Sequence, residues 1–214
     1  MSKHEGEILG HPKGLFVLFF TEMWERFSFY GMKGLLIYYL VRYHLFTDTN
    51  GNLLVGSYAA LVYAMPVLGG YLADKYLGFR KAVTFGAILL VLGHLGMAYE
   101  GHAAEMVDGV VKRDSTALQV FYFSLSLIVM GVGFLKANIS SIVGELYEKQ
   151  DPRKESGFTI FYMGINLGSL LATIVCVWLG EEYGWAYGFG SAGIGMLLGL
   201  LVFISGKKHF MGKG

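Results

Sequence analysis

Long apolar stretches separated by short polar segments dominate the chain. Six of them reach or exceed the ~20 residues that a helix needs to cross the apolar core of a bilayer. Their approximate ranges are 14–43, 53–76, 80–99, 116–147, 157–180 and 184–205. Stretches of this length are too long for strands, and lipid tolerates no unpaired backbone. The pattern predicts an all-α membrane protein with six transmembrane helices in one bundle over residues 14–205. Residues 1–13 form a tail, and residues 206–214 begin a polar linker.

Composition supports a membrane protein and excludes several other classes. Of the 214 residues, 54% are hydrophobic and only 15% are charged, whereas soluble domains carry about 25% charged residues. The net charge of +1 gives no electrostatic footprint for nucleic acid. The single cysteine, Cys176, has no partners at metal-ligand spacing. We therefore expect a lipid bilayer as partner, and neither a nucleic acid nor a metal site.

The basic residues predict the orientation of the chain. Eleven of the 17 Lys and Arg residues fall in the two tails and in the links after the second and fourth stretches. Only Lys112 and Arg113 fall in the links on the opposite side. By the positive-inside rule, both termini of the chain face the cytoplasm of a cell membrane that is crossed several times.

Charged residues inside the apolar stretches are the main candidate for function. Each costs roughly 2.5–3.5 kcal/mol at the centre of a bilayer on insertion scales. At 100° per residue, the polar positions of the first stretch share an arc of about 140°; they are Glu22, Glu25, Arg26, Tyr30 and Lys33. Three residues from other stretches lie at a similar depth, roughly 14–16 Å from the cytoplasmic end: Tyr63, Lys136 and Asn166. We expect these groups to face a central cavity.

The chemistry of this stripe is that of a proton-linked anion site. A buried carboxyl group beside Arg or Lys can exchange an ion pair for a proton. A proton on Glu22 or Glu25 would free Arg26 or Lys136 to bind another anion, such as a substrate carboxylate. The alternative is a static network of buried ion pairs. The sequence contains no nucleophile–base pair, so that it does not indicate an enzyme.

The turn between the second and third stretches is a candidate conformational latch. Asp74 at a helix end can pair with a neighbouring helix, and Arg80 and Lys81 follow it. Pro66 predicts a kink in the second helix. The alternative is a loop whose charges only fix the orientation.

Four motifs resemble those of the proton-coupled oligopeptide transporters of the major facilitator superfamily. Residues 22–30 (EMWERFSFY) resemble the ExxERFxYY motif on the first helix of that family. Residues 69–78 (GGYLADKYLG) and 158–170 (FTIFYMGINLGSL) resemble its two signatures, and residues 131–138 (GVGFLKAN) resemble the segment with its lysine. The resemblance covers nearly the whole chain and implies the N-terminal six-helix half of a two-bundle fold.

The resemblance implies symport of di- and tripeptides with protons, with no cofactor besides the coupling proton and with a C-terminal six-helix bundle as partner. It implies proton coupling by Glu22, Glu25, Arg26 and Lys136. It implies peptide binding by Arg26, Tyr30, Lys33, Tyr63, Lys136 and Asn166. Two alternatives stay open: another transporter of the superfamily, for nitrate, amino-acid conjugates or drugs, and a membrane binding module that does not transport.

Overall fold

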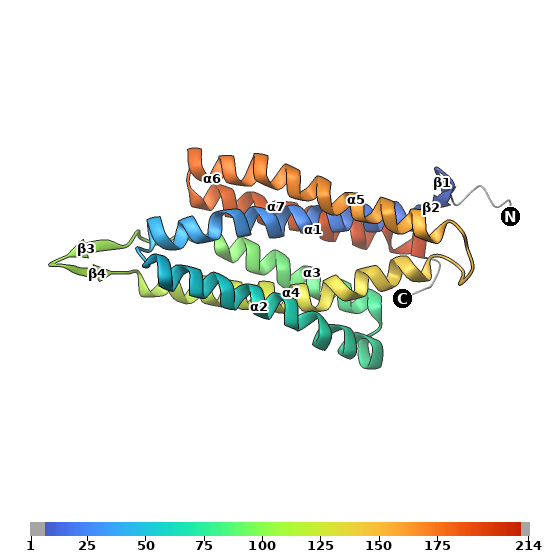
Figure 1. Cartoon of the computed structure of the whole chain (residues 1–214), viewed down its shortest axis with the longest axis horizontal. Coiled ribbons are helices and arrows are strands. Elements are labelled where there is room, and N and C mark those ends of the chain that lie inside the picture. The colour runs from blue at the N-terminus through green and yellow to red at the C-terminus, as the bar shows by residue number, and fades with distance from the viewer. Residues whose placement is uncertain (1–6, 211–214) are drawn as a thin grey trace.

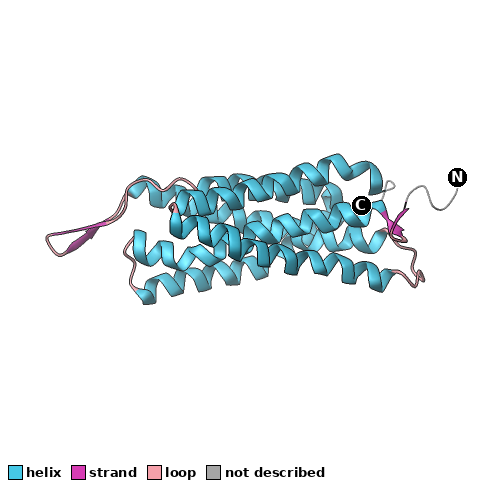
Figure 2. Ribbon diagram, turned by 90° about the horizontal axis from the view of Figure 1, so that it is seen from above, coloured by secondary structure: helices cyan, strands magenta, loops and turns pink. Residues whose placement is uncertain are grey.

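The computed structural model describes residues 7–210, and long helices run side by side along its long axis (Figures 1 and 2). Three of the helices continue into short π-helical turns, labelled η. The elements in chain order are α1 (Lys13–Tyr38) with η1 (Tyr39–Tyr43), α2 (Asp48–Leu72) with η2 (Ala73–Leu77), α3 (Phe79–Met97), α4 (Ser115–Glu145), α5 (Lys154–Ala172) with η3 (Thr173–Val177) and α6 (Trp178–Glu182), and α7 (Trp185–Gly206) with the 3₁₀ turn η4 (Lys207–Phe210). The predicted all-α bundle is confirmed.

Five of these helical stretches are long and apolar enough to cross a membrane. They are Asp48–Leu77, Phe79–Met97, Ser115–Glu145, Lys154–Glu182 and Trp185–Phe210. The stretch from Lys13 to Tyr43 is as long, but it carries six charged residues: Lys13, Glu22, Glu25, Arg26, Lys33 and Arg42. That this first stretch also crosses the membrane stays a prediction.

The second helix begins at Asp48, five residues before the predicted start at residue 53. Thr47 caps it, because its side-chain oxygen accepts a hydrogen bond from the backbone N–H of Asn50. A polar first turn of a helix has no apolar periodicity, so the hydrophobic pattern missed it.

Two antiparallel hairpins lie in segments that the sequence analysis treated as a tail and a link. β1 (Glu7–Ile8) pairs with β2 (His11–Pro12), and β3 (Glu105–Val107) pairs with β4 (Val110–Lys112). Asp108 and Gly109 join β3 to β4 at φ +52° and +78°, the geometry that favours Asp-Gly in two-residue hairpin turns.

Glycines allow the helices to approach one another closely. A Cβ at Gly69 of α2 would collide with the Gly133 carbonyl of α4, and a Cβ at Gly168 of α5 would collide with the Met23 carbonyl of α1. Likewise, a Cβ at Gly31 of α1 would collide with the sulfur of Cys176, which is fully buried. Such contacts are typical of helix packing in membranes, where small residues let backbones meet.

The start of α1 and the end of α7 lie at one end of the bundle, and the β3–β4 hairpin extends from the opposite end (Figure 1). α1 packs mainly against α5 and α7, and α4 packs against α2 and α3. Glu22, Glu25 and Arg26 of the polar stripe of α1 lie buried inside the bundle, between the two ends.

Candidate functional site: buried charges on α1

Three charged side chains of α1 form a buried cluster. Glu22, Glu25 and Arg26 are only 3%, 1% and 5% exposed. The Nε of Arg26 lies 3.2 Å from Oε1 of Glu22 and also donates to Oε2 of Glu25. The spacing i, i+3 and i+4 places all three on one helix face, as the sequence predicts. On its other side the guanidinium lies 5.1 Å from the centre of the Phe29 ring.

The cluster is held together at one nitrogen and leaves other polar atoms unpaired. Oε2 of Glu22, Oε1 of Glu25 and Nη2 of Arg26 are buried without a hydrogen-bond partner among residues 7–210. A buried polar atom without a hydrogen bond lowers the stability of the folded protein, so each one needs a physical explanation. A cluster with spare acceptors and a spare donor can take up a proton or a polar ligand without first losing all its internal bonds.

Lys136 of α4 and Tyr63 of α2 form a second part of the candidate site. The Lys136 ammonium lies 5.0 Å from the centre of the Tyr63 ring, within the range of cation–π attraction. The structure thus brings Tyr63 of α2 and Lys136 of α4 together. That they act with the α1 cluster stays a prediction.

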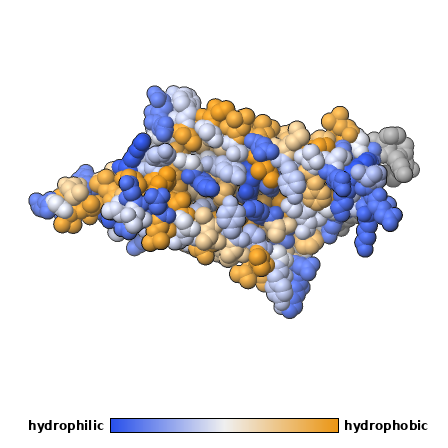
Figure 3. Space-filling view, viewed as in Figure 1, coloured by the Kyte–Doolittle hydropathy of each residue, from blue (hydrophilic) through white to orange (hydrophobic). Residues whose placement is uncertain are grey.

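The remaining predicted binding residues lie on a more open face. Tyr30 is half-buried, Lys33 and Asn166 are exposed, and Tyr63 is 66% exposed. Lys33 and Asn166 make no side-chain hydrogen bond or ion pair to the described residues 7–210. In Figure 3 hydrophilic side chains appear in the middle of the molecule, between its two ends. The structure does not bring Lys33 or Asn166 into contact with the cluster, so their role in binding stays a prediction.

The charged residues of the predicted latch lie at the junction of η2 and α3. Asp74 lies in η2, is exposed, and makes no ion pair within the part of the chain that the structure describes. Lys81 is exposed and Arg80 is half-buried at the start of α3. Pro66 lies inside α2, which continues beyond it to Leu72. A latch by Asp74, Arg80 and Lys81 therefore stays a prediction.

Comparison with known proteins identifies the family. Residues 80–214 match the sequence profile of the POT family, PTR2, and this range is more than half of the chain. The chain belongs to the POT family.

Two relatives show how much of a POT protein this chain spans. It is 46% identical over 213 residues to the uncharacterised transporter YclF of Bacillus subtilis (strain 168), covering 95% of the chain and 39% of that relative. It is 39% identical over 220 residues to a di-/tripeptide transporter of Lactococcus lactis subsp. lactis (strain IL1403), covering 98% of the chain and 41% of the relative. The chain thus spans about two fifths of the relatives it matches.

A solved structure shows the same fold. The crystal structure of a POT family transporter in complex with a thioalcohol-conjugated peptide superposes with a TM-score of 0.86 at 35% identity. The match covers 98% of this chain and 41% of that one. These relatives and the protein of the related structure are named as transporters, not as enzymes.

Tyr58 is a buried polar residue near the cluster that the sequence analysis missed. It is almost fully buried in α2, and its hydroxyl has no hydrogen-bond partner within the described part of the chain. No local pattern distinguishes Tyr58 from the other tyrosines of the chain; only the packing of α2 shows that it points inward.

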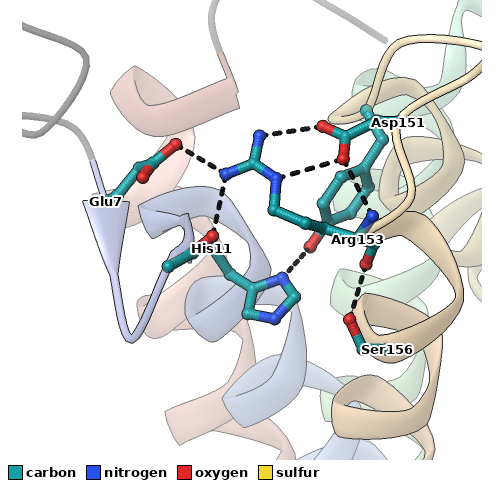
Figure 4. Close-up of polar contacts among 7 residues, drawn as sticks. Glu7, His11, Asp151, Arg153 and Ser156 are labelled. Atoms are coloured by element: carbon teal, nitrogen blue, oxygen red, sulfur yellow. Dashed lines mark hydrogen bonds and ion pairs between the residues drawn. The ribbon is translucent and has the colours of Figure 1, made fainter.

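A second charged cluster ties the β1–β2 hairpin to the loop between α4 and α5 (Figure 4). Nη1 of Arg153 donates to Oε1 of Glu7 and to the carbonyl of Gly10, both at 2.8 Å. Nε and Nη2 of Arg153 donate to the two oxygens of Asp151, at 3.0 and 2.8 Å. These bonds lower the pKa of Asp151 to about 2. Nearby, His11 Nδ1 and the Tyr147 hydroxyl form a buried hydrogen bond of 2.8 Å.

Proposed function

We propose that this chain is the N-terminal half of a transporter that carries di- and tripeptides together with protons by alternating access. In this proposal all six helical stretches cross the cell membrane, and both ends of the chain lie in the cytoplasm. A second six-helix bundle completes the central site. The names of the relatives and the peptide in the related structure support the substrate class.

The observation that carries the proposal is the incompletely paired cluster of Glu22, Glu25 and Arg26 inside an otherwise apolar bundle. Packing alone gives no reason to retain it, since a well-packed apolar core is often as stable as a buried ion pair or more stable. Ionisable groups inside membrane helices generally mark ion or substrate pathways.

Charge balance connects the proton to the substrate. With both carboxylates ionised, Glu22 and Glu25 balance Arg26 and Lys136. One proton on either carboxyl group leaves a net charge of +1 on the four residues. A peptide carboxylate then neutralises the site, with Arg26 or Lys136 as its partner. Proton uptake and peptide uptake thus stabilise each other, which is the thermodynamic basis of symport.

Tyr30 and Lys33 follow Arg26 on the same side of α1 by one and two helical turns, and Tyr63 and Asn166 belong to α2 and α5. In the proposal these side chains surround the peptide, and the second bundle closes the cavity from the opposite side. Transporters of this kind bind near the midplane of the membrane, and the two halves rock around the bound substrate. The exposure of these polar side chains in the single bundle is consistent with a cavity that needs a second wall.

The test uses the intact transporter in proteoliposomes. We expect Glu22→Gln to abolish dialanine uptake driven by a proton gradient while sparing the exchange of peptide across the membrane. Lys136→Ala should also abolish driven uptake. Glu182→Gln and Lys149→Ala, both exposed and remote from the cluster, serve as controls. Normal driven uptake by both site variants would contradict the mechanism.

A second candidate is transport of another anionic solute, because the cluster recognises a carboxylate or similar anion and nothing in it selects a peptide bond. Competition distinguishes the two candidates. Unlabelled dipeptides should reduce uptake of the labelled substrate if the protein carries peptides, and should leave it unchanged if it carries nitrate, amino-acid conjugates or drugs. A binding module that does not transport would give no proton flux when peptide is added.

A further inference from the structure

A groove of about 430 Å³ lies between α1 and α7, at the end of the bundle where α1 begins and α7 ends. Its α1 wall consists of Lys13, Phe16, Val17 and Phe20. Residues at spacings of three, four and seven share one face of a helix. Lys13 is the first residue of α1, and Phe20 lies about 10 Å further into the bundle. This wall therefore changes from basic to apolar along the helix.

The α7 wall changes in the same direction. Lys208 and His209 line the groove at the end of the bundle, and Val202 lines it about 9 Å deeper. Ser205 lies between them, and its hydroxyl donates to the Val202 carbonyl. Both walls thus place their basic residues at the end of the bundle and their apolar residues toward its middle.

Beneath the groove, α1 packs closely against the end of α7 and against η4. A Cβ at Gly206 would collide with the Val17 side chain, and a Cβ at Gly14 would lie 2.9 Å from the His209 carbonyl. Since these glycines bring α1 into direct contact with α7 and η4, the groove is part of the packed bundle.

The groove is separate from the charged cluster of α1. Lys13 and Glu22 are nine residues apart, which is two and a half helical turns, so they lie on opposite sides of α1. The groove therefore opens away from the polar stripe, on a side of the bundle where we expect lipid.

The charges around the groove favour an anion. Lys13, Lys208 and His209 are its ionisable lining residues, and no carboxylate lines it among residues 7–210. Ile8 of β1 also lines the groove, and the next residue, Leu9, is 85% exposed. Apolar and basic side chains thus meet at this rim, as at the surface of a membrane.

We propose that this groove binds an anionic phospholipid. The lipid phosphate lies against Lys13, Lys208 and His209, and an acyl chain follows Phe16, Phe20 and Val202 toward the middle of the membrane. A free phosphate ion would use only the basic end. The continuous apolar walls, which point in the direction of an acyl chain, favour the lipid.

Native mass spectrometry of the intact transporter in detergent tests this site, with phosphatidylglycerol and phosphatidylcholine as probes. We expect Lys13→Gln/Lys208→Gln to weaken phosphatidylglycerol binding by roughly thirtyfold. Each basic residue near an anionic lipid contributes about five- to sixfold in affinity, and the double variant loses two of them. The control Lys149→Gln/Lys154→Gln removes the same charge from the α4–α5 link, outside the groove, and should bind normally. Equal losses in both variants, or equal binding of the two lipids by the unmodified protein, would overturn the proposal.

A second variant separates lipid from free phosphate. Val202→Trp keeps every charge and fills the apolar half of the groove, so it should weaken phosphatidylglycerol binding at least several-fold. Inorganic phosphate should not displace the lipid. Displacement by inorganic phosphate together with normal lipid binding by Val202→Trp would identify a phosphate site and refute the lipid site. Size-exclusion elution identical to that of the unmodified protein shows that each variant is folded.

Discussion

Two clusters of this protein each combine one arginine with two carboxylates, and they differ in how fully they are paired. Around Arg153, Nε, Nη1 and Nη2 all donate hydrogen bonds, to Asp151, Glu7 and the Gly10 carbonyl. Around Arg26, one nitrogen contacts both carboxylates, and three other polar atoms of the cluster remain unpaired. The arginine side chain is 43% exposed in the first cluster and 6% exposed in the second.

Under the proposed mechanism, this difference separates a structural role from a functional one. In the Arg153 cluster, the guanidinium nitrogens donate hydrogen bonds that join two segments far apart in the sequence. Because the cluster is exposed, water can replace any of these hydrogen bonds that is lost. The Arg26 cluster retains capacity for a proton or an anion, at a position where water is scarce. Variants that alter matching members of the two clusters should therefore have unequal effects.

The largest expected effect comes from replacing each arginine. Arg26→Leu leaves Glu22 and Glu25 buried without their cation and should lower the free energy of unfolding by about 3–5 kcal/mol, as for other broken buried ion pairs. Arg153→Leu should have a much smaller effect, because its partners remain hydrated. Chemical unfolding of the intact transporter in detergent measures both. Similar losses in the two variants would refute the distinction.

Replacing one carboxylate in each cluster should separate transport from stability. Glu25→Gln removes a proton acceptor and an ionic hydrogen bond, and should reduce proton-driven peptide uptake roughly 10- to 100-fold, the equivalent of about 1.5–3 kcal/mol. Glu7→Gln should leave uptake close to that of the unmodified protein. Initial rates in proteoliposomes give both values, and a comparable loss for Glu7→Gln would place the Arg153 cluster in the transport cycle.

A smaller effect is expected from the contact between Lys136 and Tyr63. Tyr63→Leu removes the ring and should raise the KM for dialanine about two- to fivefold, as expected for a cation–π contact of about 0.5–1 kcal/mol. Tyr63→Phe keeps the ring and should stay near the unmodified value. If Tyr63→Phe is as impaired as Tyr63→Leu, the hydroxyl rather than the ring is the functional group.

The smallest effect is a pH dependence of the Arg153 cluster. The pKa of Asp151 is lowered to about 2 in the folded protein, compared with about 4 in an unfolded chain. The ionised form of Asp151 therefore favours folding: its contribution is complete above about pH 5 and is lost as the pH falls from about 4 through about 2. The difference in unfolding free energy between the unmodified protein and Asp151→Asn should shrink over that range. A difference that grows toward low pH would have the wrong sign.

The helical bundle and the charged stripe of α1 could be predicted from the sequence because both depend on local spacing. Glu22, Glu25 and Arg26 share a face in any α-helix, and long apolar stretches indicate membrane helices without reference to the rest of the chain. The hairpin between Glu105 and Lys112 also had a local signal, Asp108-Gly109, that the analysis of apolar stretches did not use.

Contacts between distant segments could not be predicted in this way. Equal depth along two helices suggested a link between Tyr63 and Lys136, but it could not show that the ammonium meets the ring. Nothing in the sequence connects Glu7 with Arg153, which lies 146 residues away. The inward orientation of Tyr58 depends on how α2 packs against its neighbouring helices. The position of Tyr58 in the sequence does not reveal that packing.

The burial of Cys176 beneath Gly31 makes this chain a convenient background for thiol chemistry. The single thiol of the sequence, that of Cys176, is buried and inaccessible to aqueous reagents, so a cysteine introduced elsewhere supplies the reactive thiol of this chain. Met106, exposed on the β3–β4 hairpin, and Lys149, exposed at the opposite end, are suitable positions. A maleimide that cannot cross membranes would then label only the position on its own side, and so would reveal which end of the bundle faces the cytoplasm.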